Sequence, residues 1–259
     1  MERRTENDAR PAFELIGLCK RFGAKVAVDH VDLEVPAGSF YGLVGPNGAG
    51  KTTALSMGVG LLRPDAGRAE VFGADVWADP LTTKRLVGVL PDGLAMPERL
   101  TGLEVLTYLG LLRGMDERTV AERARDLLEV MELEADAHTL VIEYSAGMRK
   151  KVGLATALLH APRLLVLDEP FEAVDPVSAM TIRALLRRFV EGGGSVVISS
   201  HVMALVEQIC DHVGVIARGR IAAAGPLTDV QGGRSLEERF VELVGARTGD
   251  AGGLAWLTA

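Results

Sequence analysis

One nine-residue segment constrains this chain more than any other part of it. Residues 45–53, Gly-Pro-Asn-Gly-Ala-Gly-Lys-Thr-Thr, fit the phosphate-binding pattern G-x-x-x-x-G-K-[ST]. Glycines allow the main chain to curl tightly, so that several backbone N–H groups can meet triphosphate oxygens at once. A Gly-rich turn that only joins a strand to a helix does not require Lys51 followed by Thr52 at this spacing. The sequence therefore predicts a binding site for a nucleoside triphosphate.

The residue types in and around this loop predict separate roles. Lys51 supplies a positive charge toward the β- and γ-phosphates, and the hydroxyl of Thr52 offers a ligand for Mg²⁺. A helix that opens at about Lys51 adds the positive end of its dipole, and the apolar residues 40–44 predict a buried strand before the loop. We expect the nucleotide to contact the whole loop, namely Gly45, Pro46, Asn47, Gly48, Ala49, Gly50, Lys51, Thr52 and Thr53.

A pair of carboxylates follows a second apolar run. Residues 164–167 (Leu-Leu-Val-Leu) end in Asp168-Glu169-Pro170. A carboxylate at the end of a buried strand can reach the magnesium shell, and its neighbour can orient and deprotonate the attacking water. An acidic strand end before a turn is common in any protein, but it is much less expected by chance behind a phosphate loop. We assign Asp168 to Mg²⁺ and Glu169 to the general base.

Strands and helices are predicted to alternate along the chain, which is the pattern of a largely parallel sheet covered on both faces. The predicted strands are residues 13–18, 31–35, 40–44, 86–90, 164–167, 196–199 and 213–217, the last pairing with 220–223 in a hairpin. Helices dominate residues 97–160, where one begins at the capping box of Thr101 and Glu104. We expect one α/β domain over residues 11–245 with this helical stretch inserted, and flexible ends at 1–10 and 246–259.

Charge and cysteine content limit the expected partners. The chain has 28 basic and 35 acidic residues, a formal net charge of −7, and no dense basic tract, so we expect no nucleic-acid partner. Apolar runs such as 152–159 are far shorter than the ~20 residues of a membrane span. The cysteines Cys19 and Cys210 lie far apart and suggest no metal-ligand cluster, which favours a reducing cytosolic compartment.

A third motif points to a family. In residues 144–148, Tyr-Ser-Ala-Gly-Met, Ser145 alone would be an ordinary helix N-cap. Together with the phosphate loop and the Asp168-Glu169 pair, however, this motif resembles the Leu-Ser-Gly-Gly-Gln signature of the ATP-binding cassette (ABC) family. The resemblance extends from about residue 13 to residue 244. It implies an α/β P-loop NTPase (RecA-like) core with an N-terminal antiparallel β subdomain and an inserted helical subdomain, and ATP and Mg²⁺ as cofactors.

The resemblance also implies roles for residues outside these motifs. Phe22 would stack on adenine, with a core phenylalanine as the alternative, and His201 would contact the γ-phosphate. Asp175 falls in the D-loop and also fits a helix N-cap. Two ABC domains meet head to tail in this family, so Ser145 and Gly147 would serve the nucleotide of a partner domain.

Three features of the sequence depart from the family pattern. Asp92 stands where the family usually has a Gln that touches magnesium, and its carboxylate would repel the γ-phosphate when no metal is present. Ala146 and Met148 replace a usual Gly and Gln of the signature. Residues 171–174 (Phe-Glu-Ala-Val) before the D-loop are bulkier than usual.

The resemblance implies an ATPase subunit of a transporter, with a separate transmembrane permease and a second ABC domain, in the simplest case another copy in a homodimer. Such a subunit would lie on the cytoplasmic face of the plasma membrane. Residues 235–243 resemble the short terminal helix of ABC-2-type exporters. The alternatives are a soluble ABC ATPase that acts on ribosomes or nucleic acid, and a small-molecule kinase or GTPase, which would lack the signature and His201.

Overall fold

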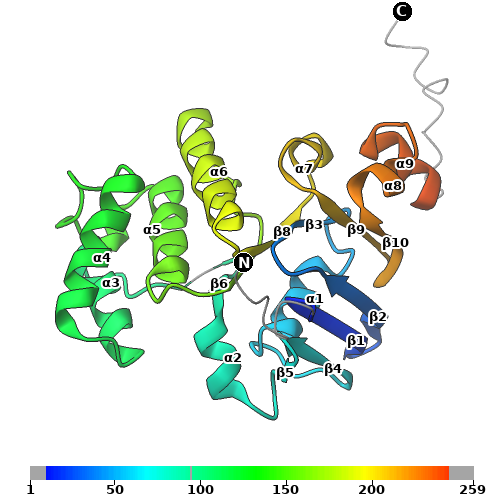
Figure 1. Ribbon diagram of the computed structural model, residues 1–259, viewed down its shortest axis with the longest axis horizontal. Coiled ribbons are helices and arrows are strands. Elements are labelled where there is room, and N and C mark those ends of the chain that lie inside the picture. The colour runs from blue at the N-terminus through cyan, green and yellow to red at the C-terminus, as the bar shows by residue number, and fades with distance from the viewer. Residues whose placement is uncertain (1–9, 94, 245–259) are drawn as a thin grey trace, which may run out of the picture.

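The computed structural model describes residues 10–93 and 95–244, so the expected flexible ends lie outside it except for Arg10 (Figure 1). In chain order the elements are β1 (Phe13–Phe22), β2 (Lys25–Val35), β3 (Phe40–Val44), α1 (Lys51–Gly58), β4 (Ala66–Val71), β5 (Ala74–Asp75), α2 (Pro80–Leu86), β6 (Val87–Leu90), α3 (Gly102–Leu112), α4 (Glu117–Val130), η2 (Val141–Glu143), α5 (Ala146–Leu158), β7 (Leu164–Leu167), α6 (Pro176–Glu191), β8 (Ser195–Ser200), α7 (Met203–Ile209), β9 (His212–Ala217), β10 (Arg220–Pro226), α8 (Leu227–Gln231) and α9 (Leu236–Val244).

The larger sheet is mainly parallel. Its six strands follow the order β10-β9-β3-β8-β7-β6. β3 lies parallel to β8 and β9, and β7 lies parallel to β8 and β6, whereas β10 is antiparallel to β9. All residues of β3, β7 and β8 are buried, as expected when both faces of a parallel sheet are covered. The predicted parallel sheet and the hairpin at Arg218-Gly219 are confirmed.

Two separate apolar cores lie on the two faces of this sheet. One core joins β3, β7 and β8 to α1 and to the strands of a second sheet, and it includes Leu43, Met57 and Phe13. The other core joins the opposite face of the same strands to α5, α6 and α7, and it includes Val44 and Leu154. Because successive side chains of a strand point to opposite faces, neighbouring residues such as Leu43 and Val44 enter different cores.

The second sheet is antiparallel, with the strand order β2-β1-β4-β5. It is the N-terminal antiparallel β subdomain that the family resemblance implies. The strands predicted from the sequence are shorter than β1 and β2, and β4 and β5 were not predicted. In β4 only the second half is buried or half-buried, and β5 has two residues. Their own sequences therefore carry little apolar periodicity, and pairing such as that of Phe13 with Val71 holds them in place.

Helices form the stretch predicted to be helical. Figure 1 shows α3, α4 and α5 grouped at one end of the molecule, away from the antiparallel strands. The capping box is confirmed, because Glu104 N donates to Thr101 Oγ1 at 3.2 Å and Thr101 N donates to Glu104 Oε2 at 2.8 Å. The inserted helical subdomain is therefore present, and we keep 97–160 as its proposed extent. Within the described residues, no helix combines the length and apolar character needed to cross a membrane.

Candidate nucleotide-binding site

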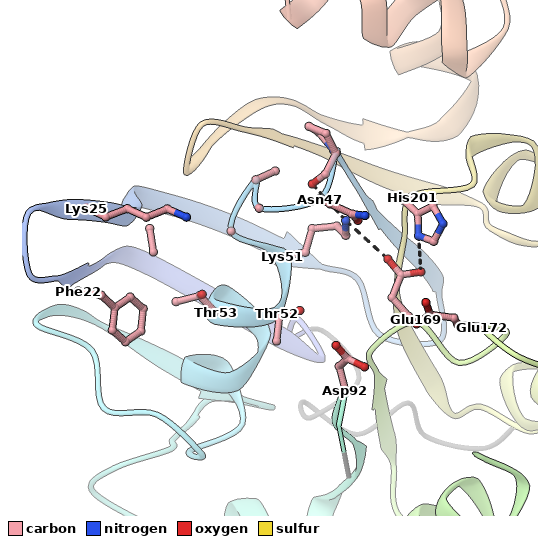
Figure 2. Close-up of a pocket in the computed structure, with 15 residues that line it drawn as sticks. Phe22, Lys25, Asn47, Lys51, Thr52, Thr53, Asp92, Glu169, Glu172 and His201 are labelled. Atoms are coloured by element: carbon pink, nitrogen blue, oxygen red, sulfur yellow. Dashed lines mark hydrogen bonds and ion pairs between the residues drawn. The ribbon is translucent and has the colours of Figure 1, made fainter. Parts of the chain in front are cut away.

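A cavity of about 430 Å³ opens over the phosphate loop (Figure 2). Segments from five parts of the chain meet there: the turn between β1 and β2, the loop between β3 and α1, and the residues after β6, β7 and β8. The lining residues are Phe22, Lys25, Ala27, Pro46, Asn47, Gly48, Ala49, Gly50, Lys51, Thr52, Thr53, Asp92, Glu169, Glu172 and His201. The structure thus brings most of the predicted site residues into one place.

The backbone of the phosphate loop needs its glycines. Gly50 has a φ of 110°, and a Cβ there would lie 2.5 Å from the Ala27 carbonyl oxygen. A Cβ on Gly45 would lie 2.3 Å from the Ile216 carbonyl oxygen. α1 begins at Lys51, as predicted, and among the described residues no side chain caps its first turn. Its free N–H groups therefore face the loop, which is an arrangement suited to an anion.

Lys51 places its charge inside the loop. The residue is 6% exposed, and its Nζ donates to the carbonyl oxygens of Gly45 at 2.7 Å and Pro46 at 3.4 Å. Nζ also lies 3.6 Å from Glu169 Oε1. A phosphate group that enters the loop therefore competes with Glu169 for the lysine.

Asp168 and Glu169 are held at the end of β7 by a residue from the neighbouring strand. Ser199 on β8 donates its hydroxyl hydrogen to Asp168 Oδ1, and its Oγ accepts a hydrogen bond from Glu169 N at 2.9 Å. Glu169 has a φ of 46°, a left-handed conformation that is uncommon for residues other than glycine. The tertiary contact with Ser199 thus holds both the Asp168 side chain and the Glu169 backbone at the end of β7.

Figure 2 shows Glu169 between the side chains of Lys51 and His201. His201 Nδ1 lies 3.1 Å from Glu169 Oε2, while Lys51 is near Oε1. The His201 side chain is 44% exposed, so it borders the open part of the cavity. Both oxygens of the predicted base therefore have a partner that can orient them.

The remaining cavity residues lie around the loop. Thr52 and Asp92 line the cavity from α1 and from the segment after β6, whereas Asp168 directly follows β7 and does not line the cavity. The Phe22 side chain is 51% exposed at the turn between β1 and β2, so the core alternative for it is wrong. Three lining residues, Lys25, Ala27 and Glu172, were not predicted from the sequence. The signal for Lys25 was its place three residues after Phe22, which puts its side chain beside the predicted adenine contact.

Besides Gly45 and Asp168, which directly precede lining residues, three predicted residues do not line this cavity. Ser145 caps α5 by accepting a hydrogen bond from Met148 N at 3.2 Å. Asp175 caps α6, where bonds from Ser178 and Val177 lower the pKa of its carboxyl group. A Cβ on Gly147 would lie 3.0 Å from the Ala173 carbonyl oxygen, so the signature touches the segment before the D-loop. The structure does not bring these residues to the phosphate loop of the same chain.

Comparison with known proteins identifies the family. Residues 28–172 match the family model described as ABC transporter. The chain belongs to the ABC transporter family. It is 39% identical over 214 residues to the daunorubicin/doxorubicin resistance ATP-binding protein DrrA of Streptomyces peucetius, covering 83% of this chain and 65% of that protein. It is also 36% identical to the Nod factor export ATP-binding protein I of Rhizobium sp. (strain N33), and the match covers 84% of this chain and 71% of that protein.

A solved structure supports the same assignment at the level of fold. The ATP-binding subunit of an ABC transporter superposes with a TM-score of 0.83 at 30% identity, covering 90% of this ABC protein and 99% of that chain. The family and the fold class predicted from sequence are confirmed, and a small-molecule kinase or GTPase is the wrong alternative. The chain spans about two thirds of the length of the curated relatives it matches.

Proposed function

We propose that this chain binds and hydrolyses ATP to power a membrane exporter of the ABC-2 type. The observation that carries the proposal is the convergence of Lys51, Glu169 and His201 at one phosphate loop. The names of the relatives support the export role, because they include a drug-resistance ATP-binding protein and a Nod factor export ATP-binding protein.

The residues of the cavity fit a magnesium nucleotide. The glycines form a cradle that a Cβ would fill, and Lys51 provides a buried positive charge for the β- and γ-phosphates. Thr52 and Asp168 would hold Mg²⁺, with Asp92 beside them, and oxygen atoms are the ligands that this ion prefers. When bound, Mg²⁺ would neutralise charge that develops on the phosphate oxygens. Phe22, exposed at the edge of the cavity, offers an aromatic surface to adenine.

Glu169 is the residue that we propose as general base. Its two oxygens lie near Lys51 and His201, which orient the carboxylate toward the cavity. Phosphate oxygens attract Lys51 away from Oε1, so that Oε1 becomes free to accept the proton of the attacking water. His201 remains beside Oε2 and would contact the γ-phosphate. Binding of the nucleotide and release of the base are therefore linked through Lys51.

The proposed site is completed by a second ABC domain. Ser145 and Gly147 lie outside the cavity, at the start of α5, where helix N–H groups can approach an anion. We propose that they contact the nucleotide of a second copy of this chain, with Asp175 at the contact. ATP binding would then close the dimer and hydrolysis would open it. The dimer would lie on the cytoplasmic face of the plasma membrane, bound to a separate transmembrane permease that uses this motion.

Replacing the base tests the proposal. The Glu169→Gln variant should keep ATP binding and form a stable ATP-bound dimer, because only proton acceptance is lost. Size-exclusion chromatography with ATP and an ATPase assay at increasing enzyme concentration measure this. Glu172→Gln is the matched control, since Glu172 lines the same cavity, and we expect it to retain hydrolysis. A monomeric Glu169→Gln protein with ATP, or a normal turnover rate in this variant, would contradict the assignment.

A further inference from the structure

A second cluster of reactive side chains lies where β1 pairs with β2, outside the nucleotide cavity. The pairing shifts register between the residue pairs Leu18↔Val31 and Lys20↔Val28. One residue of β1, Cys19, therefore lies opposite two residues of β2, Asp29 and His30. This is a β-bulge, and bulges turn side chains away from the regular alternation of a strand. His30 has a φ of 52°, which is rare for residues other than glycine.

The bulge brings three donor atoms of different chemistry together. One atom each from Cys19, Asp29 and His30 lies within 4.8 Å of the other two. His30 Nδ1 is 2.8 Å from Asp29 Oδ1, and the backbone N–H of His30 donates to Cys19 Sγ at 3.3 Å. Cys19 and Asp29 are half-buried and His30 is exposed, so ions can reach the cluster from solution.

We propose that Cys19, Asp29 and His30 bind a divalent transition-metal ion of the Zn²⁺ type. Thiolate, imidazole and carboxylate are the ligands that zinc takes in proteins. Mg²⁺ and Ca²⁺ prefer oxygen ligands, so the thiolate and the imidazole select against them. A tetrahedral zinc with bonds of about 2.0–2.3 Å places its ligands about 3.3–3.8 Å apart. The three side chains therefore need only small rotations to reach this geometry.

A neighbouring arginine already holds one of the ligands. Arg220 donates from Nε at 2.9 Å and from Nη2 at 2.6 Å, and both bonds end on Asp29 Oδ2. Oδ1 remains on the side of His30 and Cys19. Partners of this kind orient metal ligands in known sites and contribute to affinity. Arg220 therefore restricts the orientation of the Asp29 carboxylate and leaves Oδ1 on the side of His30.

The cluster is close to the phosphate loop through the backbone. Asp29 N donates to Gly219 O at 2.8 Å, and Gly219 N donates to Ala49 O at 2.9 Å. Two hydrogen bonds thus separate the bulge from a residue that lines the nucleotide cavity. A metal at the bulge would stiffen the strand that supports the loop.

The spacing between the two cysteines does not predict this cluster. Cys19 and the Asp29-His30 pair lie on different strands, and only the register of the bulge brings them together. By contrast, Cys210, Asp211 and His212 are consecutive in the sequence. In the described part of the chain, their ligand atoms do not form a group of this kind.

Cobalt absorption of the full-length chain tests the proposal. Co²⁺ replaces Zn²⁺ in such sites, and a thiolate ligand adds a charge-transfer band in the near ultraviolet. Because the chain has only two cysteines, this band reports on one of two thiols and ignores any Co²⁺ bound at Glu169 and His201. The variants are Cys19→Ser and His30→Asn, since Asn also tolerates the left-handed conformation. The matched controls are Cys210→Ser and His212→Asn, and circular dichroism checks that each variant is folded.

We expect one Co²⁺ per chain with a thiolate band in the unmodified protein and in both controls, and Zn²⁺ should remove the band by displacement. Cys19→Ser should abolish the band, and His30→Asn should weaken binding by at least about tenfold. The absence of a band in the unmodified protein would overturn the proposal. A band that persists in Cys19→Ser, or an affinity unchanged in His30→Asn, would also overturn it.

Discussion

Replacing Ser199 by alanine tests whether the carboxylates at the end of β7 depend on β8 for their position. Ser199 and Asp168 are 0% and 4% exposed. The Ser199 hydroxyl donates to Asp168 Oδ1 and accepts from Glu169 N. The substitution therefore removes one hydrogen bond to a charged group and leaves the backbone N–H of Glu169 without this partner.

The size of the effect follows from these two bonds. A hydrogen bond to a charge contributes about 1.5–3 kcal/mol, and a buried donor left without a partner costs about 1–3 kcal/mol. Since the two terms share one hydroxyl and are not additive, we expect the free energy of unfolding to fall by about 2–4 kcal/mol. Displacement of Asp168 and Glu169 also raises the barrier for hydrolysis, and each 1.4 kcal/mol or so lowers kcat about tenfold. We therefore expect kcat to fall at least about tenfold.

Ser195→Ala is the matched control for this experiment. Ser195 lies on the same strand and is also 0% exposed, but its Oγ accepts from Gly38 N at 2.8 Å at the opposite end of β8. It should lose about 1–3 kcal/mol of stability with an unchanged kcat. Urea unfolding and steady-state ATPase assays of both variants measure the two quantities. A normal kcat in Ser199→Ala would refute the positioning role of Ser199. An equal fall of kcat in Ser195→Ala would refute it as well.

Three further perturbations have defined outcomes. Asp92→Gln should raise the affinity for ATP without Mg²⁺, because a carboxylate that repels the γ-phosphate is removed; calorimetric titration showing equal affinities would contradict this. Burial and the charges of Glu70 and Glu34 raise the pKa of Glu14. Glu14→Gln should therefore stabilise the protein at pH 7 by about 0.2–1 kcal/mol, and this gain should disappear in acid, where Glu14 is protonated. Thermal unfolding of both proteins at neutral and acid pH measures the difference. Burial, assisted by the charge of Arg113, lowers the pKa of His160 to about 4 from 6.5. The free energy of unfolding should therefore fall by up to about 3 kcal/mol as the pH drops between these two values. Urea unfolding of His160→Gln should show a weaker dependence of this free energy on pH.

The parts of the site that could be predicted are those that depend on residues close together in the sequence. The phosphate loop needs glycines and Lys51-Thr52 at fixed spacing, and Asp168-Glu169 directly follows a buried strand. The helix caps Thr101 and Asp175 depend on hydrogen bonds to residues two or three positions away. Such local requirements leave a pattern in the sequence, and the structure confirms the elements that carry them.

The parts that could not be predicted depend on contacts between distant segments. Ser199 reaches Asp168 only because β8 lies beside β7, 31 positions away in the chain. The strands β4 and β5 exist through pairing rather than through their own apolar pattern. The left-handed backbone of Glu169 likewise follows from its tertiary contacts, since nothing in its residue type favours it.

The separation of the two apolar cores has a genetic consequence. α1 and the phosphate loop pack in one core with Met57, whereas α5 with the signature packs in the other with Leu154. In the proposed dimer, a substitution at Met57 damages the phosphate loop, which binds the nucleotide of the same copy. A substitution at Leu154 damages the signature, which contacts the nucleotide of the partner copy. Two such defective copies, when mixed, form one composite site from their undamaged halves. Alleles of the two cores should therefore complement each other, and alleles of the same core should not.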